Sequence, residues 1–255
     1  MKLFVCVKHV PDSAAHISVI DNLRIDENIT FLLNPYDEHA VTEAVRIRDS
    51  HPGSEVIAVC LGKSDAEKTL RSAMAMGADR GILIKTEKRH DGIETAMVLK
   101  AAIERDGSPA LIFTGKESID DQGMQTQFRL GALFDFPVAT NVVRLDIVSG
   151  KAVVDVEFSG GVADTYEMSL PCVIGAGKGL NAPKYPTVRD VMRSRKSPIQ
   201  TLEFSGLNME TPEARMEVIE LTPYIQKRQP KEITGSPLEI AQKIVEILKD
   251  EAKVL

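Results

Sequence analysis

One stretch of this 255-residue chain combines the residue types that hold an anion. It lies between an apolar run and a helical pattern, and it contains a glycine turn, two adjacent acids and several amide and hydroxyl side chains. Backbone N–H groups and the positive end of a helix dipole converge on a ligand at such a turn. The stretch is therefore a candidate nucleotide loop, although a polar strand-to-helix connection with ordinary capping explains the same pattern. Its residues are Gly115, Lys116, Glu117, Ser118, Ile119, Asp120, Asp121, Gln122, Gly123, Met124, Gln125 and Thr126.

The rest of the chain offers little catalytic chemistry. The five histidines are scattered, without metal-ligand spacing or a nucleophile beside them. Asp120 and Asp121 could bind a metal or transfer protons, but adjacent loop carboxylates more often cap a helix or accept ligand hydroxyls. Neither a dinucleotide fingerprint nor a P-loop is present. Residues 159–165 resemble a pyrophosphate loop, but they carry an extra residue before the acid and lie between two strand patterns, which predicts a hairpin turn.

Composition narrows the class of protein. A net charge of −6, 5% aromatic residues and no Trp argue against nucleic-acid binding. No apolar run approaches the roughly 20 residues that span a membrane, so we expect no direct membrane insertion. Cys6, Cys60 and Cys172 lie in apolar strand-like runs, which predicts buried, reduced thiols. Without a signal or transit pattern, we expect a cytoplasmic bacterial protein, or one of the mitochondrial matrix in a eukaryote.

Strand-like and helical patterns alternate along the first half of the chain, which predicts an α/β fold with a doubly wound, mostly parallel, Rossmann-like sheet. The strand-like runs are 3–7, 55–61, 81–84 and 111–113, and the helical patterns cover 35–51, 64–76, 91–103 and about 121–134. Ligands bind such sheets at the carboxyl ends of the strands. The loops expected to meet there are 7–13, 33–37, 61–64 and 115–126.

Several local patterns predict where helices begin and end. Asn34 is placed as the N-cap of a helix that starts at Pro35, and Gly77 as the residue that ends the second helix. Ser64 with Glu67 forms a capping-box pattern. In the helix expected at about 121–134, the apolar stripe is Met124, Phe128 and Ala132.

After Pro137 the pattern changes to alternation, which predicts an added antiparallel hairpin over 138–147, 151–158 and 163–170. A short strand at 171–175 and a basic segment at 178–196 follow. Beyond it we expect an extended C-terminal arm, with 216–220 as a candidate edge strand, and an amphipathic helix that opens with a capping box at Ser236 and Glu239. The division is then a nucleotide-binding α/β domain at 1–196 and an arm plus helix at 197–255 that packs on a partner.

These segments, in this order, resemble the beta subunit of an electron transfer flavoprotein. The residues that carry the resemblance are 7–12, 34–38, 73–80, 115–116, 119–121, 125–126 and 180–185. They extend from the start of the chain to about Lys196, and the last 60 or so residues match only in general character.

The resemblance implies an electron carrier subunit without catalytic residues of its own, because the redox chemistry belongs to the flavin. It implies an alpha-subunit partner that holds most of the FAD, and structural AMP on this chain. By position, the adenine-nucleotide site would use Cys6, Asn34, Pro35, Tyr36, Asp37, Leu61 and residues 115–126. Docking of acyl-CoA-type dehydrogenases, which pass electrons towards a quinone oxidoreductase, would use Leu180, Asn181, Lys184 and Tyr185, with Leu180 as the apolar anchor.

Two alternatives stay open. His9 and residues 11–13 look closer to bifurcating members of the family, in which a second FAD replaces AMP, whereas the loop 119–126 looks closer to the AMP pattern. From another class, a stand-alone ATP-binding protein of the universal-stress or ATP-pyrophosphatase kind shares the expected sheet, and would place its phosphate loop at 159–161.

Overall fold

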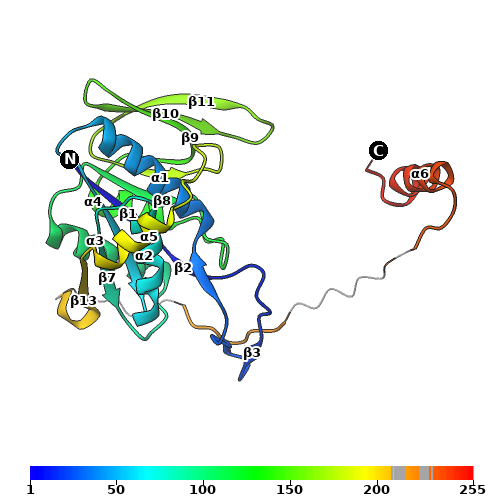
Figure 1. Ribbon diagram of the computed structural model, residues 1–255, viewed down its shortest axis with the longest axis horizontal. Coiled ribbons are helices and arrows are strands. Elements are labelled where there is room, and N and C mark those ends of the chain that lie inside the picture. Colours follow the sequence, from blue (N-terminus) through cyan, green and yellow to red (C-terminus); the bar gives the residue numbers. More distant parts are fainter. Residues whose placement is uncertain (208, 210–215, 224–229, 231, 255) are drawn as a thin grey trace.

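Nine strands form the central sheet in the part of the chain that the structure describes (Figure 1). The structure is a computed structural model, and the residues described are 1–207, 209, 216–223, 230 and 232–254. The strand order across the sheet is β11-β10-β9-β12-β8-β1-β6-β7-β13. Two small antiparallel pairs, β2 with β5 and β3 with β4, lie outside it.

The strands range from two residues in β3 and β4 to 11 residues in β9. Their bounds are β1 Lys2–Cys6, β2 His9–Pro11, β3 Val19–Ile20, β4 Arg24–Ile25, β5 Phe31–Leu33, β6 Glu55–Gly62, β7 Arg80–Lys85, β8 Leu111–Gly115, β9 Val138–Val148, β10 Lys151–Glu157, β11 Ala163–Ser169, β12 Cys172–Ala176 and β13 Ile199–Glu203. In the described central sheet, the neighbours from β9 through β12, β8, β1, β6 and β7 to β13 are parallel. The antiparallel pairs of this sheet are β9 with β10 and β10 with β11. The sheet is therefore mostly parallel with an added antiparallel extension, as predicted.

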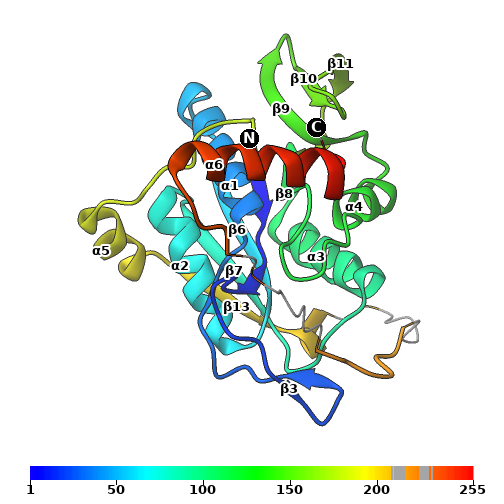
Figure 2. The same cartoon turned by 90° about the vertical axis from the view of Figure 1, so that its right-hand side faces the viewer.

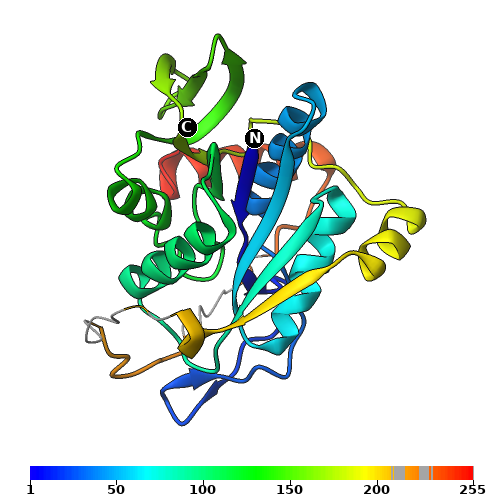
Figure 3. The ribbon, with the colours of Figure 1, turned by 90° about the vertical axis from the view of Figure 1, so that its left-hand side faces the viewer.

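Helices cover both faces of the sheet, which confirms the doubly wound α/β class (Figures 2 and 3). The α-helices are α1 Pro35–Ser50, α2 Glu67–Met76, α3 Gly92–Asp106, α4 Thr126–Phe134, α5 Val188–Lys196 and α6 Pro237–Glu246, with short turns of other helix types at Ser64–Ala66, Phe204–Leu207 and Ile247–Glu251. Apolar residues of α1 and α2 share one core cluster, and those of α3 and α4 share the other. Each cluster takes alternate residues of the strands, because successive side chains of a strand point to opposite faces.

The strand order reverses between β1 and β8. The chain runs from β1 outward to β6 and β7, and then returns to place β8 on the other side of β1. In open α/β sheets this reversal leaves a crevice at the carboxyl ends of the two strands, because their connections leave in opposite directions. The loops that follow β1 and β8 are 7–13 and 115–126, and both therefore begin at this reversal of strand order.

Several local predictions are confirmed. α1 begins at Pro35 after Asn34, and Gly77 ends α2 with a φ of 132°. Residues 159–161 lie in the turn between β10 and β11 rather than at a strand-to-helix connection. The three cysteines are buried and free, and Ser236 and Glu239 form a capping box at the start of α6.

Three local predictions are wrong. A 3-10 turn occupies Ser64–Ala66, so α2 starts at Glu67 without a side-chain cap and the capping box is absent. α4 starts at Thr126 instead of about 121, because Gln122 and Met124 adopt left-handed φ values of 51° and 54° that cannot continue a helix. Its buried face is Gln127, Leu130 and Gly131, whereas Met124 and Phe128 of the expected stripe are exposed.

The segment after α5 also differs from expectation. β13 adds an edge strand beside β7, where no strand was predicted, whereas residues 216–220 form no strand. Leu202 of β13 is buried against the sheet, and this apolar contact explains why the strand forms at that position. The parallel partner β7 could not be inferred locally, since it lies more than 100 residues earlier in the chain.

α6 stands away from the α/β body in Figure 1. Its capping box and amphipathic pattern form as predicted, but none of its residues is buried, and Leu238, Ile244 and Val245 are exposed. No helix within the described ranges is both long and apolar enough to cross a membrane.

Candidate functional site

A buried carboxylate, Asp37, joins the carboxyl ends of β1 and β8. Its Oδ2 accepts the backbone N–H of Lys8 at 2.7 Å, and its Oδ1 accepts that of Gly115 at 2.9 Å. Asn34 Nδ2 donates a third hydrogen bond to Oδ1 at 3.0 Å. Burial raises the pKa of Asp37 to about 7, although the three N–H donors oppose this shift. The first turn of α1 is thereby locked to both strands that border the reversal of strand order.

Asn34 extends the same junction into the candidate loop. Its Nδ2 donates to the carbonyl oxygen of Glu117 at 2.9 Å, and its Oδ1 accepts the N–H of Ile119 at 3.2 Å. The side chain makes no capping bond to α1, even though the helix starts directly after it. Its Nδ2 and Oδ1 atoms instead bond to the segment 117–119. An amide suits this buried position because it supplies both a donor and an acceptor.

Gly115 is required by the close approach of α1. A Cβ at this position would lie 2.5 Å from Asp37 Oδ1, 2.6 Å from Tyr36 Cβ and 2.9 Å from the Tyr36 carbonyl carbon. One of these atoms belongs to the backbone, so a side-chain rotation cannot relieve the clash. The end of β8 and the start of α1 can therefore meet only at a glycine.

Lys8 connects the β1 loop to the acids of the candidate loop. Its Nζ lies 2.8 Å from Asp120 Oδ1, 2.9 Å from Asp121 Oδ2 and 3.1 Å from Ser118 Oγ. Burial by itself would raise the pKa of Asp121, but the hydrogen bonds from Lys8 and Ser118 lower it to about 2. The two acids are thus held by a cation, which reduces their repulsion of an anionic ligand.

The N-terminus of α4 is open towards this loop. Gln125, the residue before the helix, makes no side-chain capping bond. The side chain of Gln127 is buried and fixes the loop, because its Nε2 donates to the carbonyl oxygens of Lys116 and Met124 at 3.0 and 3.2 Å. An uncapped helix N-terminus leaves backbone N–H groups that favour an anion.

Thr114, the penultimate residue of β8, gives a second observation that points to a ligand. Its hydroxyl is buried and has no hydrogen-bond partner among the residues described. Buried polar groups in folded proteins are nearly always paired. An unpaired hydroxyl, an uncapped helix and the Gly115 approach together fit a phosphorylated nucleotide at the strand ends.

The remaining residues of the expected nucleotide site surround this junction. Cys6 is buried at the end of β1, and burial raises the pKa of its thiol, so it contributes packing. Tyr36 lies under Lys116, whose Nζ is 5.3 Å from the ring centroid. Leu61 packs in the core cluster of α3 and α4. His9 of the β1 loop contacts Asp65 and Thr69, which lie just beyond the loop 61–64.

Three functional positions were not singled out from the sequence. Lys8 lies in a segment that carries the family resemblance. No local signal shows that its side chain bonds to Ser118, which lies 110 residues later in the chain. Thr114 and Gln127 are a buried hydroxyl and a buried amide, and burial of one polar side chain leaves no periodic pattern in a sequence.

The expected docking residues divide into two groups. Leu180 is half-buried and packs against the core cluster of α1 and α2. Asn181 binds α1, because its Nδ2 donates to the His39 carbonyl oxygen and to Glu43 Oε2, both at 3.0 Å. Lys184 and Tyr185 are exposed, and 90% of the Tyr185 surface is accessible.

An open, mostly parallel sheet with helices on both faces and a reversal of strand order defines a doubly wound, Rossmann-like α/β protein. The model of the electron transfer flavoprotein domain matches residues 22–207. Electron transfer flavoprotein beta subunits from Bacillus subtilis and Dictyostelium discoideum are 32% and 33% identical to the chain, which they cover completely, with 100% and 99% of their own lengths aligned. The mitochondrial beta subunit of Arabidopsis thaliana is 35% identical, with complete coverage of both chains. The chain belongs to the electron transfer flavoprotein family and, within it, to the beta subunits.

Membership places this chain in electron transport as one subunit of a flavin-containing heterodimer. A beta subunit implies an alpha-subunit partner. Within the described ranges, no group of three or more histidine, cysteine or acidic side chains is arranged to hold a metal ion.

Proposed function

We propose that this beta subunit binds AMP structurally, helps to enclose the FAD held by the alpha subunit, and docks acyl-CoA-type dehydrogenases so that electrons pass to a quinone oxidoreductase. The observation that carries the nucleotide proposal is the junction at Asp37. It joins the loops after β1 and β8 to the start of α1. Asn34 bonds to Glu117 and Lys8 bonds to Asp121, so both residues are also tied to the segment 115–126. The same proposal places the complex in the bacterial cytoplasm, or in the mitochondrial matrix of a eukaryote.

AMP is favoured over a second FAD by the position of His9. Its ring stacks on Phe31 with centroids 4.7 Å apart, and its Nδ1 lies 2.7 Å from Thr69 Oγ1. Desolvation lowers the pKa of His9, which favours a neutral ring. The residue that resembled the bifurcating members therefore has a structural role between the β2–β5 pair and α2.

Nucleotide extraction tests this proposal. We expect the complex purified with its alpha subunit to release AMP and FAD in equal amounts after acid treatment. Two FAD per heterodimer would support the bifurcating alternative instead. A colourless monomer that binds ATP without a partner would support the stand-alone class, for which the exposed turn at 159–161 offers no helix N-terminus.

Substitution of Lys8 by methionine tests the closure of the site. We expect AMP to bind about tenfold more weakly, because two carboxylates would face the phosphate without their cation. Equilibrium dialysis of the AMP-depleted complex with labelled AMP measures this effect. The matched control is Lys63→Met in the β6–α2 connection, whose ion pair with Glu27 lies outside the Asp37 junction and should leave affinity unchanged. Equal losses in both variants would contradict the role of Lys8.

Docking is better explained by exposed side chains than by Leu180. Tyr185 and Val188 are 90% and 79% exposed, and Met192 is exposed one turn further along α5. The same helix carries Arg189, Arg193 and Arg195, so basic side chains accompany the exposed apolar ones. We propose that this surface, formed by Tyr185, Val188 and Met192, contacts the dehydrogenase, and that Leu180 stabilises the fold by packing on the core cluster.

Two variants separate these roles. Val188→Ser should slow electron transfer from the partner dehydrogenase about tenfold without changing the unfolding midpoint, since an exposed apolar contact is lost only in the complex. Leu180→Ala should lower the free energy of unfolding by about 2 kcal/mol, because it removes a side chain packed on the core. Stopped-flow flavin reduction and urea titration measure the two effects. The surface assignment fails if Leu180→Ala slows transfer at unchanged stability while Val188→Ser does not.

We propose that the segment from 197 onward packs on the alpha subunit, with α6 as its anchor. The exposed stripe of Leu238, Ile244 and Val245 supports this, because an amphipathic helix requires a second surface to bury its apolar face. β13 follows residue 196 but belongs to the central sheet, so the part available to a partner begins after it.

A further inference from the structure

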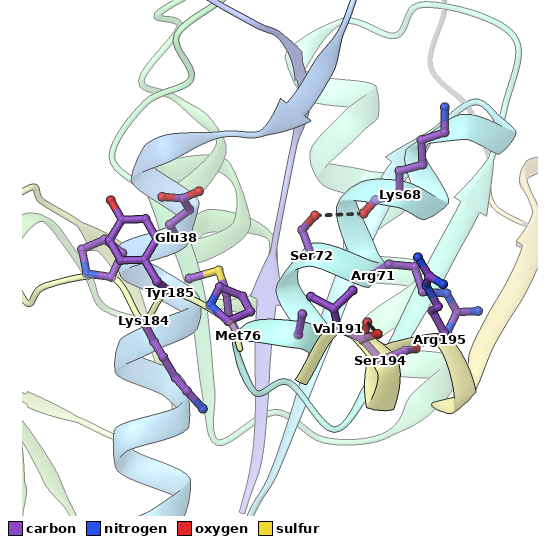
Figure 4. Close-up of a pocket in the computed structure, with 13 residues that line it drawn as sticks. Glu38, Lys68, Arg71, Ser72, Met76, Lys184, Tyr185, Val191, Ser194 and Arg195 are labelled. Carbon is purple, nitrogen blue, oxygen red and sulfur yellow. Dashed lines mark hydrogen bonds between the residues drawn. The ribbon is translucent and has the colours of Figure 1, made fainter. Parts of the chain in front are cut away.

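A cavity of about 440 Å³ is lined by residues of α1, α2 and α5 (Figure 4). The C-terminal end of α5 is bonded to α2 beside this cavity. There, Arg71 Nη1 donates to the carbonyl oxygens of Ser194 and Ser197 at 2.6 Å. The loop 183–186 closes the other side. This volume lies within the range typical of small-molecule sites.

The walls of the cavity are apolar. Ala75 and Met76 are buried beneath it, Val191 and the Tyr185 ring border it, and Pro183 and Pro186 complete the loop side. The two serines of the lining are already hydrogen-bonded to backbone, since Ser72 Oγ donates to the Lys68 carbonyl oxygen and Ser194 Oγ to that of Val191. Few uncharged polar groups therefore remain to recognise a sugar or another polyhydroxylated ligand.

Most of the charged side chains that line the cavity are cationic. Lys68, Arg71, Lys184 and Arg195 line it against one acid, Glu38. Arg71 is paired with Glu67, whereas Lys68 and Arg195 have neither an ion pair nor a side-chain hydrogen bond within the described ranges. Figure 4 shows Lys68, Arg71 and Arg195 on the side of α2 and α5, and Glu38 near Tyr185 at the opposite side. A negative head group is thus favoured at one end only.

We propose that this cavity, which we call the α2–α5 pocket, binds a small amphiphilic anion. Its head, a carboxylate or a phosphate, pairs with Arg195, and its ring or short alkyl chain lies on Met76, Val191 and Tyr185. The proposal is independent of the nucleotide site, because none of the residues of the Asp37 junction lines this pocket.

Probes with one tail and different heads test the charge requirement. Decanoate, decyl phosphate, decanol and decyltrimethylammonium are titrated into the purified complex, with displacement of anilinonaphthalene sulfonate fluorescence as the readout. We expect both anions to displace the dye, decanol to be at least about tenfold weaker, and the cation to be without effect, since a paired charge contributes more than a tenfold factor in a partly buried site. The ratio of decanoate to decyl phosphate affinity identifies which head the pocket prefers.

Two charge reversals on α5 test the location. Arg195→Glu lines the pocket, whereas Arg189→Glu makes the same charge change on the same helix outside it. We expect the first to weaken decanoate about tenfold or more and the second less than about twofold, because only the first removes the direct partner of the head group. Both positions are exposed, so the fold should tolerate either change. Equal effects of the two variants, equal affinity for decanol and decanoate, or no displacement at about 1 mM decanoate would overturn the proposal.

Discussion

Replacing Gly115 by alanine is expected to lower the free energy of unfolding by about 3 kcal/mol and to abolish AMP retention. The new Cβ would lie 2.5 Å from Asp37 Oδ1 and 2.9 Å from the Tyr36 carbonyl carbon. Relief of this overlap requires the end of β8 to separate from the start of α1, which breaks the Gly115 N–H bond to Asp37. Urea unfolding and nucleotide extraction of the purified complex measure the two losses.

Gly123→Ala is the matched control in the same loop. A Cβ there would meet only the Asp121 side chain, at an ordinary contact distance of 3.5 Å. We expect stability within about 0.5 kcal/mol of the wild type and normal AMP content. Comparable damage from both substitutions would show that the loop is sensitive to any added side chain, and would contradict the particular role of the β8–α1 approach.

The second large effect is a pH dependence that originates from Asp37. Burial raises its folded-state pKa to about 7, whereas an unfolded aspartate titrates near 4. Between these values the folded state holds a proton that the unfolded state has lost. The stabilising contribution is therefore fully present below about pH 4 and is lost as the pH rises through about 7, with a slope of up to about 1.4 kcal/mol per pH unit.

Asp37→Asn should remove this slope. We expect the stability of the wild type, relative to the variant, to fall between about pH 4 and about pH 7, measured by urea titration at fixed protein concentration. Asp155→Asn serves as the control of opposite sign, because the hydrogen bonds from Arg144 and Thr165 lower the pKa of that exposed carboxyl. Parallel profiles for the wild type and Asp37→Asn would show that Asp37 does not titrate in this range.

If the Asp37 junction organises the nucleotide site, replacing Asp37 should also weaken the binding of AMP. Ionised Asp37 accepts both the Lys8 and the Gly115 N–H groups, whereas asparagine has one oxygen for the two strands. Affinity measured for Asp37→Asn at a single pH therefore reports the cost of a loosened junction, separately from the pH slope of stability.

Local pattern determined much of this protein. The apolar runs of β1, β6, β7 and β8 are long enough and regular enough to show a parallel sheet, because strands buried on both faces exclude polar residues. Asn34-Pro35 marked the start of α1, and Ser236 with Glu239 marked α6, because capping is a local hydrogen-bond problem. The family followed from ordered motifs, whereas the assignment of the loop 115–126 to a ligand site stays a prediction.

Tertiary structure decided the rest. The start of α4 moved to Thr126 because left-handed residues and the buried Gln127 amide hold the loop open, and β13 formed because β7 offered an unpaired edge. Contacts between segments far apart in the chain bring Lys8 to Asp121 and place Leu180 on the core. Val188 is left exposed to solvent. A sequence records which groups can form hydrogen bonds or bury apolar surface. Which partner each group meets depends on chain packing, and that packing bonded the segment Gly115–Thr126 to Asn34, Asp37 and Lys8.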